Sequence, residues 1–189
     1  MGRVAGKIAI VTGGGTGIGR AAATRLAEEG AIVTIAEFDA ANGQAVAEEL
    51  GGDAAFVEHD VREEASWQNL MKSVADRHGR PDILVNNAGI LATNNNQELA
   101  VTDLEQWRAV QQVNVEGVFL GCKYGVDAMI ANGGRAKGGA GGGAIVNMSS
   151  IAGLVATAHL VAYGASKGAV RQMTKSVAID CAKKGLGIR

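Results

Sequence analysis

Short apolar runs alternate with longer amphipathic segments along most of the chain. Residues 7–12 form an apolar run bounded by glycine, as buried strands do, whereas residues 17–29 carry apolar side chains at helical spacing and stop at Gly30. The same patterns recur, and they predict strands at 7–12, 31–36, 54–58, 83–86 and 144–148 and helices at 17–29, 40–50, 62–78, about 103–131 (two helices or one bent helix) and 161–184.

Strands that alternate with helices predict a parallel sheet covered by helices on both faces. Because the crossovers between parallel strands are right-handed, the expected fold is an α/β, doubly wound, Rossmann-type sheet that forms a single domain over residues 1–189. The alternation calls for one more strand after the last helix, and a strand that begins at Ile188 would be cut off after two residues. Residues 133–143, of which seven are glycine, are interpreted as a loop.

Composition excludes several classes of partner. With 18 Lys+Arg against 19 Asp+Glu, the formal net charge is −1, which predicts no nucleic-acid partner. No apolar stretch approaches the roughly 20 residues that span a bilayer, and the N-terminal segment lacks the apolar region of a signal peptide. Cys122 and Cys181 form no CxxC pair, and no cluster has metal-ligand spacing. We therefore expect a cytoplasmic protein without metal or membrane partner, with both cysteines buried and with His59 and His78 on the surface.

The segment that joins the first strand to the first helix is rich in glycine. It reads Thr-Gly-Gly-Gly-Thr-Gly-Ile-Gly over residues 12–19, a T-G-x-x-x-G-x-G spacing rather than G-x-G-x-x-G. A sharp turn needs glycine, and a pyrophosphate can approach a helix N-terminus only where side chains are absent. A tight turn without a ligand remains the alternative. The candidate cofactor-binding residues here are Gly13, Gly15, Thr16, Gly17, Ile18 and Gly19.

An acidic residue at the end of the second strand indicates which dinucleotide would bind. Glu37 lies 18 residues after Gly19, where a carboxylate accepts hydrogen bonds from both ribose hydroxyls and repels a 2′-phosphate. Phe38 follows, so no Lys or Arg stands beside it. NAD is therefore favoured over NADP. The alternatives are that Glu37 is a solvated strand end or that Asp39 takes the role.

Two further polar positions have more than one interpretation. Asp60 follows the third strand and either accepts from the adenine amino group or caps the next helix with Glu63 as its partner, and both roles are compatible. Thr102 and Glu105 have the spacing of a capping box, which predicts that Thr102 is the N-cap of the following helix.

Tyr163 and Lys167 are four residues apart and face the same side of a predicted helix. A phenol accepts a proton near neutrality only when its phenolate is favoured, and a nearby ammonium does this. Ser150 lies 13 residues before Tyr163, beyond the carboxyl end of a predicted strand, where ligands bind in parallel sheets. Ser149 is a rival, but the interval of 13 residues selects Ser150. These residues are the candidate proton-transfer machinery.

These motifs together resemble the classical short-chain dehydrogenase/reductase family. The residues that carry the resemblance are 12–19, Asp60-Val61, Asn86-Asn87-Ala88-Gly89, Asn114, Ser150 and Tyr163-x-x-x-Lys167. The family implies an NAD(P)-dependent interconversion of a secondary alcohol and a carbonyl compound. It also implies a seven-stranded Rossmann domain in a homo-oligomer, a tetramer or a dimer, with the tyrosine-bearing helix at a subunit contact.

The resemblance assigns a role to each matching residue. Tyr163 would be the general acid/base, Ser150 would orient the substrate oxygen, Lys167 would hold the nicotinamide ribose, and Asn114 would anchor a water of a proton relay. The resemblance places further residues beside the cofactor, with Asn87 mainly bracing the sheet: Asp60, Val61, Asn86, Asn87, Ala88 and Gly89. For Asn114 the alternative is an amide inside a helix that bonds a neighbouring carbonyl.

Some segments resemble bacterial hydroxysteroid and alicyclic-alcohol dehydrogenases within the family: 59–61, 118–122, 146–150, 178–181 and 187–189. They favour bulky or cyclic secondary alcohols, steroids among them, as substrates. Because chains of this family are longer, we expect the last strand and the substrate lid to be absent from these 189 residues. A catalytically silent NAD-binding sensor or scaffold with the same fold is the alternative function.

Overall fold

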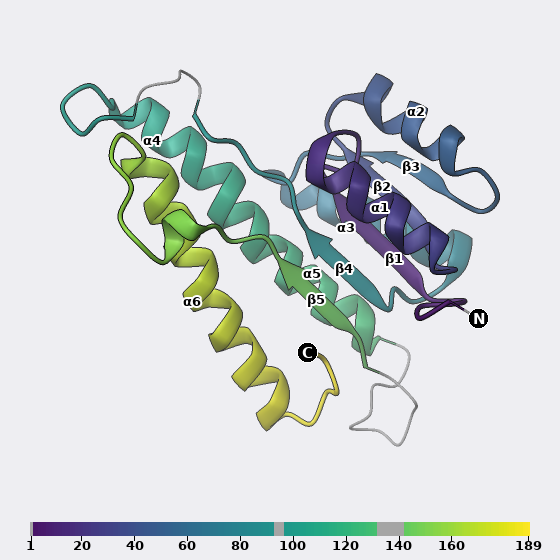
Figure 1. Cartoon of the computed structure of the whole chain (residues 1–189). Coiled ribbons are helices and arrows are strands. Elements are labelled where there is room, and N and C mark those ends of the chain that lie inside the picture. Colours follow the sequence, from purple (N-terminus) through teal and green to yellow (C-terminus); the bar gives the residue numbers. More distant parts are fainter. Residues whose placement is uncertain (1, 93–96, 132–141) are drawn as a thin grey trace.

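A computed structural model of the chain describes residues 2–92, 97–131 and 142–189. Its elements alternate as the hydrophobic pattern predicts (Figure 1). In chain order they are β1 (Ile8–Thr12), α1 (Gly17–Glu28), β2 (Ile32–Glu37), α2 (Ala40–Leu50), β3 (Ala55–Glu58), α3 (Glu64–His78), β4 (Ile83–Asn86), α4 (Leu104–Gln111), a π-helix (Gln112–Glu116), α5 (Gly117–Ile130), β5 (Ala144–Asn147), a short 3₁₀ helix (Ile151–Gly153) and α6 (Val161–Lys183). Each predicted strand and helix is present, and its ends lie within two residues of the predicted ends. Of the glycine-rich loop predicted at 133–143, residues 133–141 lie outside the described residues.

The strands form one parallel sheet in the order β3-β2-β1-β4-β5. Val11 of β1 pairs with Ile35 on one side and with Val85 on the other. The chain runs outward from β1 in both directions, so the strand order reverses between β1 and β4, where parallel sheets open a crevice at their carboxyl ends. The predicted doubly wound α/β fold is confirmed.

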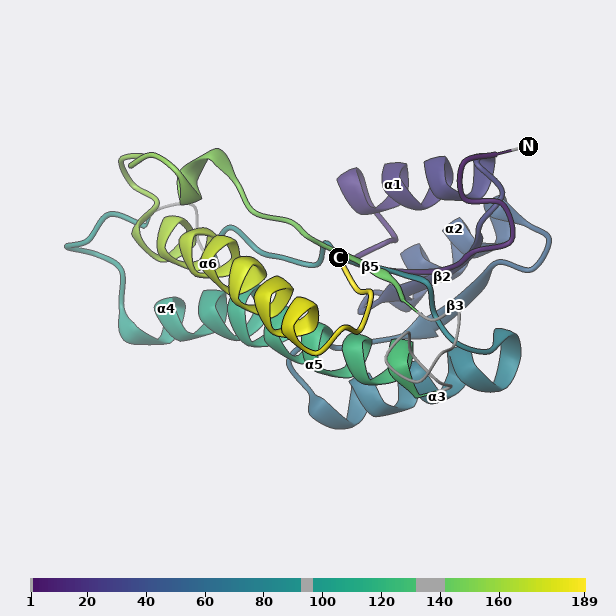
Figure 2. The ribbon, with the colours of Figure 1, turned by 90° about the horizontal axis from the view of Figure 1, so that it is seen from below.

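Helices cover both faces of the sheet. Helices α1 and α2 pack on one face, and α3, α5 and α6 lie across the other, with α4 beside α6 (Figure 2). Because side chains alternate along a strand, Val11 packs toward α1 and α2, whereas its neighbour Ile10 packs toward α3. The buried strands thus supply two apolar cores from one sheet.

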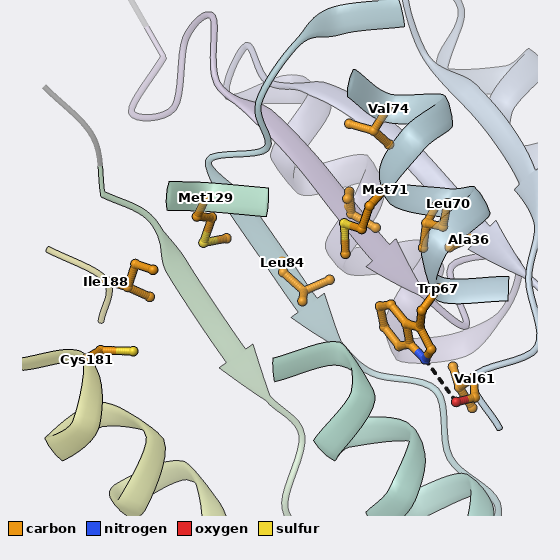
Figure 3. Close-up of a cluster of buried hydrophobic side chains, with 11 residues drawn as sticks. Ala36, Val61, Trp67, Leu70, Met71, Val74, Leu84, Met129, Cys181 and Ile188 are labelled. Atoms are coloured by element: carbon orange, nitrogen blue, oxygen red, sulfur yellow. Dashed lines mark hydrogen bonds between the residues drawn. The ribbon is translucent and has the colours of Figure 1, made fainter. Parts of the chain in front are cut away.

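Trp67 of α3 is the largest side chain of the core on the second face, and it is fully buried. Its indole Nε1 donates to the carbonyl of Val61 at 2.9 Å, so its polar atom is satisfied while the rings pack near Leu70 and Leu84 (Figure 3). This bond ties α3 to the segment that follows β3. The core therefore fixes the position of residues 59–62, which reach the crevice.

The predicted cap at Thr102 is wrong, and the structure excludes the cap role that was one of the two interpretations of Asp60. Asp103, not Thr102, caps α4 by accepting from the amide of Gln106 at 2.7 Å, while the Thr102 hydroxyl donates to the carbonyl of Glu98. Asp60 does not cap α3, because the residue at that cap position is Glu63. The Asp60 carboxylate accepts instead from Arg62, at 2.6 Å from its Nη2. A guanidinium two residues away offers several donors, whereas a cap offers one amide.

The region between α4 and α5 is a continuous helix with a π-helical turn, which decides between the two interpretations left open for 103–131.

The burial of His59 differs from the prediction. His59, expected on the surface, is 2% exposed because its ring lies edge-on against Trp67. Cys122 and Cys181 are buried, as predicted.

The last residues of the chain pair with the edge of the sheet beside β5. Ile188 forms a parallel bridge with Gly143, and the amide of Ile145 donates to the carbonyl of Arg189 at 2.8 Å. This pairing begins at the residue where the alternation calls for a further strand. No helix in the described ranges has the length and apolar character that crossing a bilayer requires.

Candidate active site

A cleft of about 660 Å³ opens at the carboxyl ends of the strands. Its lining comes from the carboxyl ends of the strands and the segments that follow them, from the π-helix and from α6. Most of the residues that the sequence singles out line it: Gly13, Thr16, Gly17, Ile18, Gly19, Glu37, Asp60, Val61, Asn87, Ala88, Gly89, Tyr163 and Lys167. The predicted site residues that do not line this cleft are Gly15, Asn86, Asn114 and Ser150. Asn86 is buried instead, and its side-chain amide donates to Oδ1 of Asn147 at 2.8 Å.

The glycine turn has the shape of a phosphate cradle. Gly17 has a φ of 51° at the start of α1, and a Cβ built there would meet nothing within 4 Å, so the cleft beside it is open. At Gly19 a Cβ would lie 2.0 Å from the carbonyl oxygen of Gly13, so a side chain cannot fit there. Helix α1 begins without a side-chain cap, which leaves the amides of its first turn available to an anion.

The Glu37 carboxylate lies against this turn. Its Oε2 accepts from the amide of Gly15 at 2.9 Å, and its Oε1 accepts from the amide of Phe38 at 2.9 Å. Gly15 is needed because a Cβ would come within 2.9 Å of Cγ of Glu37. The carboxylate thus connects the end of β2 to the turn, and Glu37 lines the cleft.

Thr12 and Asn87 hold the ends of β1 and β4 together beneath the turn. The Thr12 hydroxyl accepts from the amides of Asn87 and Ala88, both at 3.1 Å. The side-chain amide of Asn87 donates to the carbonyls of Thr12 and Gly13, at 3.0 and 3.1 Å. Asn87 therefore braces the sheet, which is the main role that the sequence analysis expects of it.

Tyr163 and Lys167 lie on α6 at the other end of the cleft. The Lys167 Nζ is 5.6 Å from the centre of the Tyr163 ring and donates to the carbonyl of Met148 at 2.8 Å. Lys167 is buried, and loss of hydration lowers the pKa of its ammonium. A phenol and a partly desolvated cation thus line one wall.

Asn114 lies behind this wall, in the π-helical turn. Its side chain accepts from the amide of Ile90 at 2.8 Å and donates to the carbonyl of Ile90 at 2.9 Å and to the hydroxyl of Ser166 at 3.0 Å. Asn114 therefore ties the loop after β4 to α6 and bonds a carbonyl, as the alternative interpretation states. At Gly89 a Cβ would lie 3.2 Å from Asn114 Oδ1 and 3.4 Å from Lys167 Nζ, so these three residues converge.

The two serines after β5 differ in position. Ser149 lines the cleft, and its hydroxyl donates to the carbonyl of Lys167 at 2.9 Å. The Ser150 hydroxyl accepts from the amide of Ala152 at 3.2 Å and caps the 3₁₀ helix. The assignment of Ser150 to the substrate oxygen, which its spacing from Tyr163 supports, stays a prediction.

Several lining residues escaped the sequence analysis. They are Phe38, His59, Arg62, Ile90, Leu91, Val113 and Met148, and Ser149, which the sequence analysis ranked below Ser150, lines the cleft as well. Phe38 and Arg62 are close in sequence to the acids Glu37 and Asp60, and this adjacency was the available signal. Met148 carries no such signal, because it serves through its backbone carbonyl. Burial among apolar groups lowers the pKa of His59 to about 4.

A sequence model described as short chain dehydrogenase matches residues 7–189. The chain belongs to this family. It is therefore an oxidoreductase of a family that binds a nicotinamide cofactor, and it resembles the hydroxysteroid and alicyclic-alcohol dehydrogenases within it.

Several relatives of this short-chain dehydrogenase match nearly all of it. The NADP-dependent (R)-specific alcohol dehydrogenase of Lentilactobacillus kefiri is 43% identical over 99% of this chain and 71% of its own. The 3-beta-hydroxysteroid dehydrogenase of Comamonas testosteroni is 38% identical over 99% and 69%, and the cyclopentanol dehydrogenase of the same species is 42% identical over 96% and 70%.

A solved structure shows the same fold. The 3-ketoacyl-(acyl-carrier-protein) reductase of Brucella melitensis, complexed with NADH, superposes with a TM-score of 0.89 at 33% identity. The match covers 98% of this chain and 74% of that chain.

Proposed function

We propose that this short-chain dehydrogenase interconverts a secondary alcohol and its ketone with NAD bound in the cleft. The observation that carries the proposal is that Tyr163 and Lys167 line the same cleft as the uncapped start of α1 and its glycine turn. A helix N-terminus suits the pyrophosphate, and the Tyr163 end suits an alcohol. Relatives named for (R)-alcohols, cyclopentanol and hydroxysteroids support a bulky or cyclic substrate.

The proton transfer is assigned to Tyr163. In the oxidation direction the phenolate accepts the hydroxyl proton of the substrate, and in the reduction direction the phenol donates it. Lys167, whose Nζ is 5.6 Å from the centre of the Tyr163 ring, stabilises the anionic phenolate, while the Met148 carbonyl and Asn114 keep the lysine and α6 in place. The nicotinamide supplies the hydride chemistry when it is bound.

Replacing the proton donor tests this assignment. We expect Tyr163→Phe to lower kcat with cyclic alcohols and steroids by about 10²-fold or more, because general acid–base catalysis contributes that much, and to leave NADH binding within about twofold. Absorbance of the reduced cofactor measures turnover. Tyr124→Phe is the matched control, since the Tyr124 hydroxyl contacts Glu64 at 2.7 Å outside the cleft. Turnover in Tyr163→Phe at the wild-type rate would refute the assignment.

The preference for NAD over NADP is assigned to Glu37. A carboxylate at the rim accepts from ribose hydroxyls and repels a 2′-phosphate, although one relative is NADP-dependent. We expect Glu37→Ala to lower the ratio of kcat/KM for NAD⁺ over NADP⁺ by about tenfold, since 1.4 kcal/mol of lost discrimination has that effect. Asp39→Asn, which keeps the cap on α2, is the control for the competing acid. A ratio unchanged in Glu37→Ala would remove the assignment.

The alternative of a silent NAD-binding sensor makes a different prediction. A sensor would bind NADH and show no turnover with any member of the panel. The presence of both Tyr163 and Lys167 in the cleft supports turnover instead.

We also propose that the enzyme is a homo-oligomer. Phe119 of α5 and Ile179 of α6 are 52% and 54% exposed. A second subunit packed on this helical face would cover them. Light scattering of the purified protein measures the mass of the assembly.

A further inference from the structure

The side-chain amide of Asn147, at the end of β5, is bonded to three other elements. Its Oδ1 accepts from Nδ2 of Asn86 in β4 at 2.8 Å and from the thiol of Cys122 in α5 at 3.6 Å. Its Nδ2 donates to the hydroxyl of Thr174 in α6 at 3.0 Å, and this hydroxyl donates in turn to the carbonyl of Val170 at 2.8 Å. These bonds hold the amide in one orientation, although it lies outside the cleft.

The residue that follows Asn147 holds the lysine of the proposed site. The carbonyl of Met148 accepts from Nζ of Lys167 at 2.8 Å, and the amide of Met148 donates to the carbonyl of Asn86 at 3.0 Å. Lys167 and Thr174 are seven residues apart, about two turns of α6, so they lie on the same face of this helix. The end of β5 is thus tied to α6 at two points about 10 Å apart along the helix. Two ties on one face prevent α6 from rotating or sliding against β5.

We propose that Asn147 and Thr174 are positioning residues, which fix the distance between the ammonium of Lys167 and the ring of Tyr163. The inference rests on the proposed function, because it takes Tyr163 to be the group that transfers the proton. The Nζ of Lys167 is 5.6 Å from the centre of the Tyr163 ring, and the attraction between an ammonium and a phenolate weakens with distance. At an effective dielectric constant of about 20, a retreat of about 1–2 Å moves the pH midpoint of phenolate formation upward by about half a pH unit.

Lys167 is the charged group beside Tyr163 among the described residues of the cleft. The other ionisable side chains that line it lie at or just beyond the ends of β2 and β3: Glu37, His59, Asp60 and Arg62. His159, which precedes α6, is exposed and lies 3.8 Å from the carboxylate of Glu98. Because replacing Thr174 by an uncharged residue adds and removes no charge, a change in the titration of Tyr163 would report a movement of Lys167.

The titration of Tyr163 can be followed without turnover. The chain contains two tyrosines, so Tyr124→Phe leaves Tyr163 as its only phenol, and the ultraviolet absorbance of the phenolate against pH gives the midpoint directly. Thr174→Val keeps the shape of the side chain and removes its hydroxyl. We expect this substitution to raise the midpoint by about half a pH unit. In the otherwise wild-type enzyme, kcat for alcohol oxidation then falls about threefold at neutral pH, because less phenolate is present, and recovers at high pH.

Matched variants separate positioning from a general loss of stability. Thr174→Ser retains the hydroxyl and keeps the wild-type midpoint and kcat. Ser176→Ala removes a hydroxyl that donates to the carbonyl of Gln172 on the exposed side of the same helix, and it also keeps both. Asn147→Leu removes the amide itself and moves the midpoint in the same direction as Thr174→Val. Urea unfolding verifies that each variant is folded at the pH values used, and Thr174→Val carries the test if Asn147→Leu does not fold.

The outcomes distinguish the positioning role from the function on which it rests. A midpoint unchanged in Thr174→Val would overturn the positioning role and leave the function standing if the wild type oxidises alcohols. A kcat lowered by the same factor at every pH would also overturn it, since a merely structural role predicts that result. If the wild type turns over no alcohol while Thr174→Val still raises the midpoint, the proposed function fails and the positioning role stands.

Discussion

His59 makes the stability of this enzyme depend on pH in a way that one substitution can isolate. Its ring lies edge-on against Trp67 with centroids 4.4 Å apart, and its Nδ1 is 2.8 Å from the hydroxyl of Ser66. Nε2 is buried without a hydrogen-bond partner among the described residues. Desolvation lowers the pKa of His59 from 6.5 to about 4, against the smaller opposing effect of Asp60. The folded protein therefore resists protonation that the unfolded chain accepts.

The sign and size of the effect follow from linkage. Between pH 6.5 and 4 the unfolded state binds one proton more than the folded state, so stability rises with pH across this window and falls as the medium is acidified. At about 1.4 kcal/mol per pH unit, the free energy of unfolding falls by about 2 kcal/mol between pH 7.5 and 5 through His59 alone, and by about 3 kcal/mol once the pH is below 4.

His59→Phe removes the titrating group and keeps a ring against Trp67. The Ser66 hydroxyl still accepts from the amide of Asp60 at 3.1 Å, so the substitution changes stability little at pH 7.5. Urea unfolding at several pH values from 7.5 to 5 measures the difference. We expect the variant to lose about 2 kcal/mol less than the wild type over this range. The control is His159→Asn, because His159 is exposed at a φ of 59° that asparagine tolerates. Parallel curves for the wild type and His59→Phe would refute the reasoning.

Two further predictions concern residues that shape the cleft. We expect Gly19→Ala to weaken NADH binding by more than about tenfold, because its Cβ would lie 2.0 Å from the carbonyl oxygen of Gly13 and would displace the turn. Fluorescence titration measures the affinity for NADH, and an unchanged affinity would contradict the prediction. Gln97 is 1% exposed, and its side chain accepts from the amide of Tyr163 at 2.8 Å. We therefore expect Gln97→Leu to lower the free energy of unfolding by about 1–3 kcal/mol and to reduce kcat. Urea unfolding and turnover at neutral pH measure the two effects, and a fully active variant would show that α6 needs no such bond.

The predictable part of the site lies where local chemistry allows few residue types. The turn over residues 12–19 was predictable because glycine adopts the φ of 51° at Gly17 without strain and because only glycine fits the close approach of Gly19 to Gly13. The strands and helices were predictable because their hydrophobic periods differ. The spacing of Tyr163 and Lys167 placed both on one helix face, and both line the cleft.

The open interpretation of Asp60 and the wrong prediction for His59 both involve competition between partners. Asp60 has a suitable position for a helix cap, but the guanidinium of Arg62 offers it more donors. His59 is polar and was expected at the surface, but it is buried because Trp67 and the end of β3 enclose it. A polar side chain bonds to the groups that the fold brings near it. The pattern of residues along the chain does not show which groups these are.

By itself, the sequence determined the order of strands and helices and the glycine turn, and it supplied the candidate residues for proton transfer, because each depends on the conformational and chemical properties of nearby residues. Only the tertiary structure decided that Met148 supplies a carbonyl to Lys167, that Asn114 links Ile90 to α6, and that the guanidinium of Arg62 lies over the ring of Phe38. Each of these contacts joins segments that are far apart in the chain, and some use backbone atoms, which every residue has and which therefore leave no signal in the sequence. They exist because the parallel sheet brings the carboxyl ends of its strands to one edge.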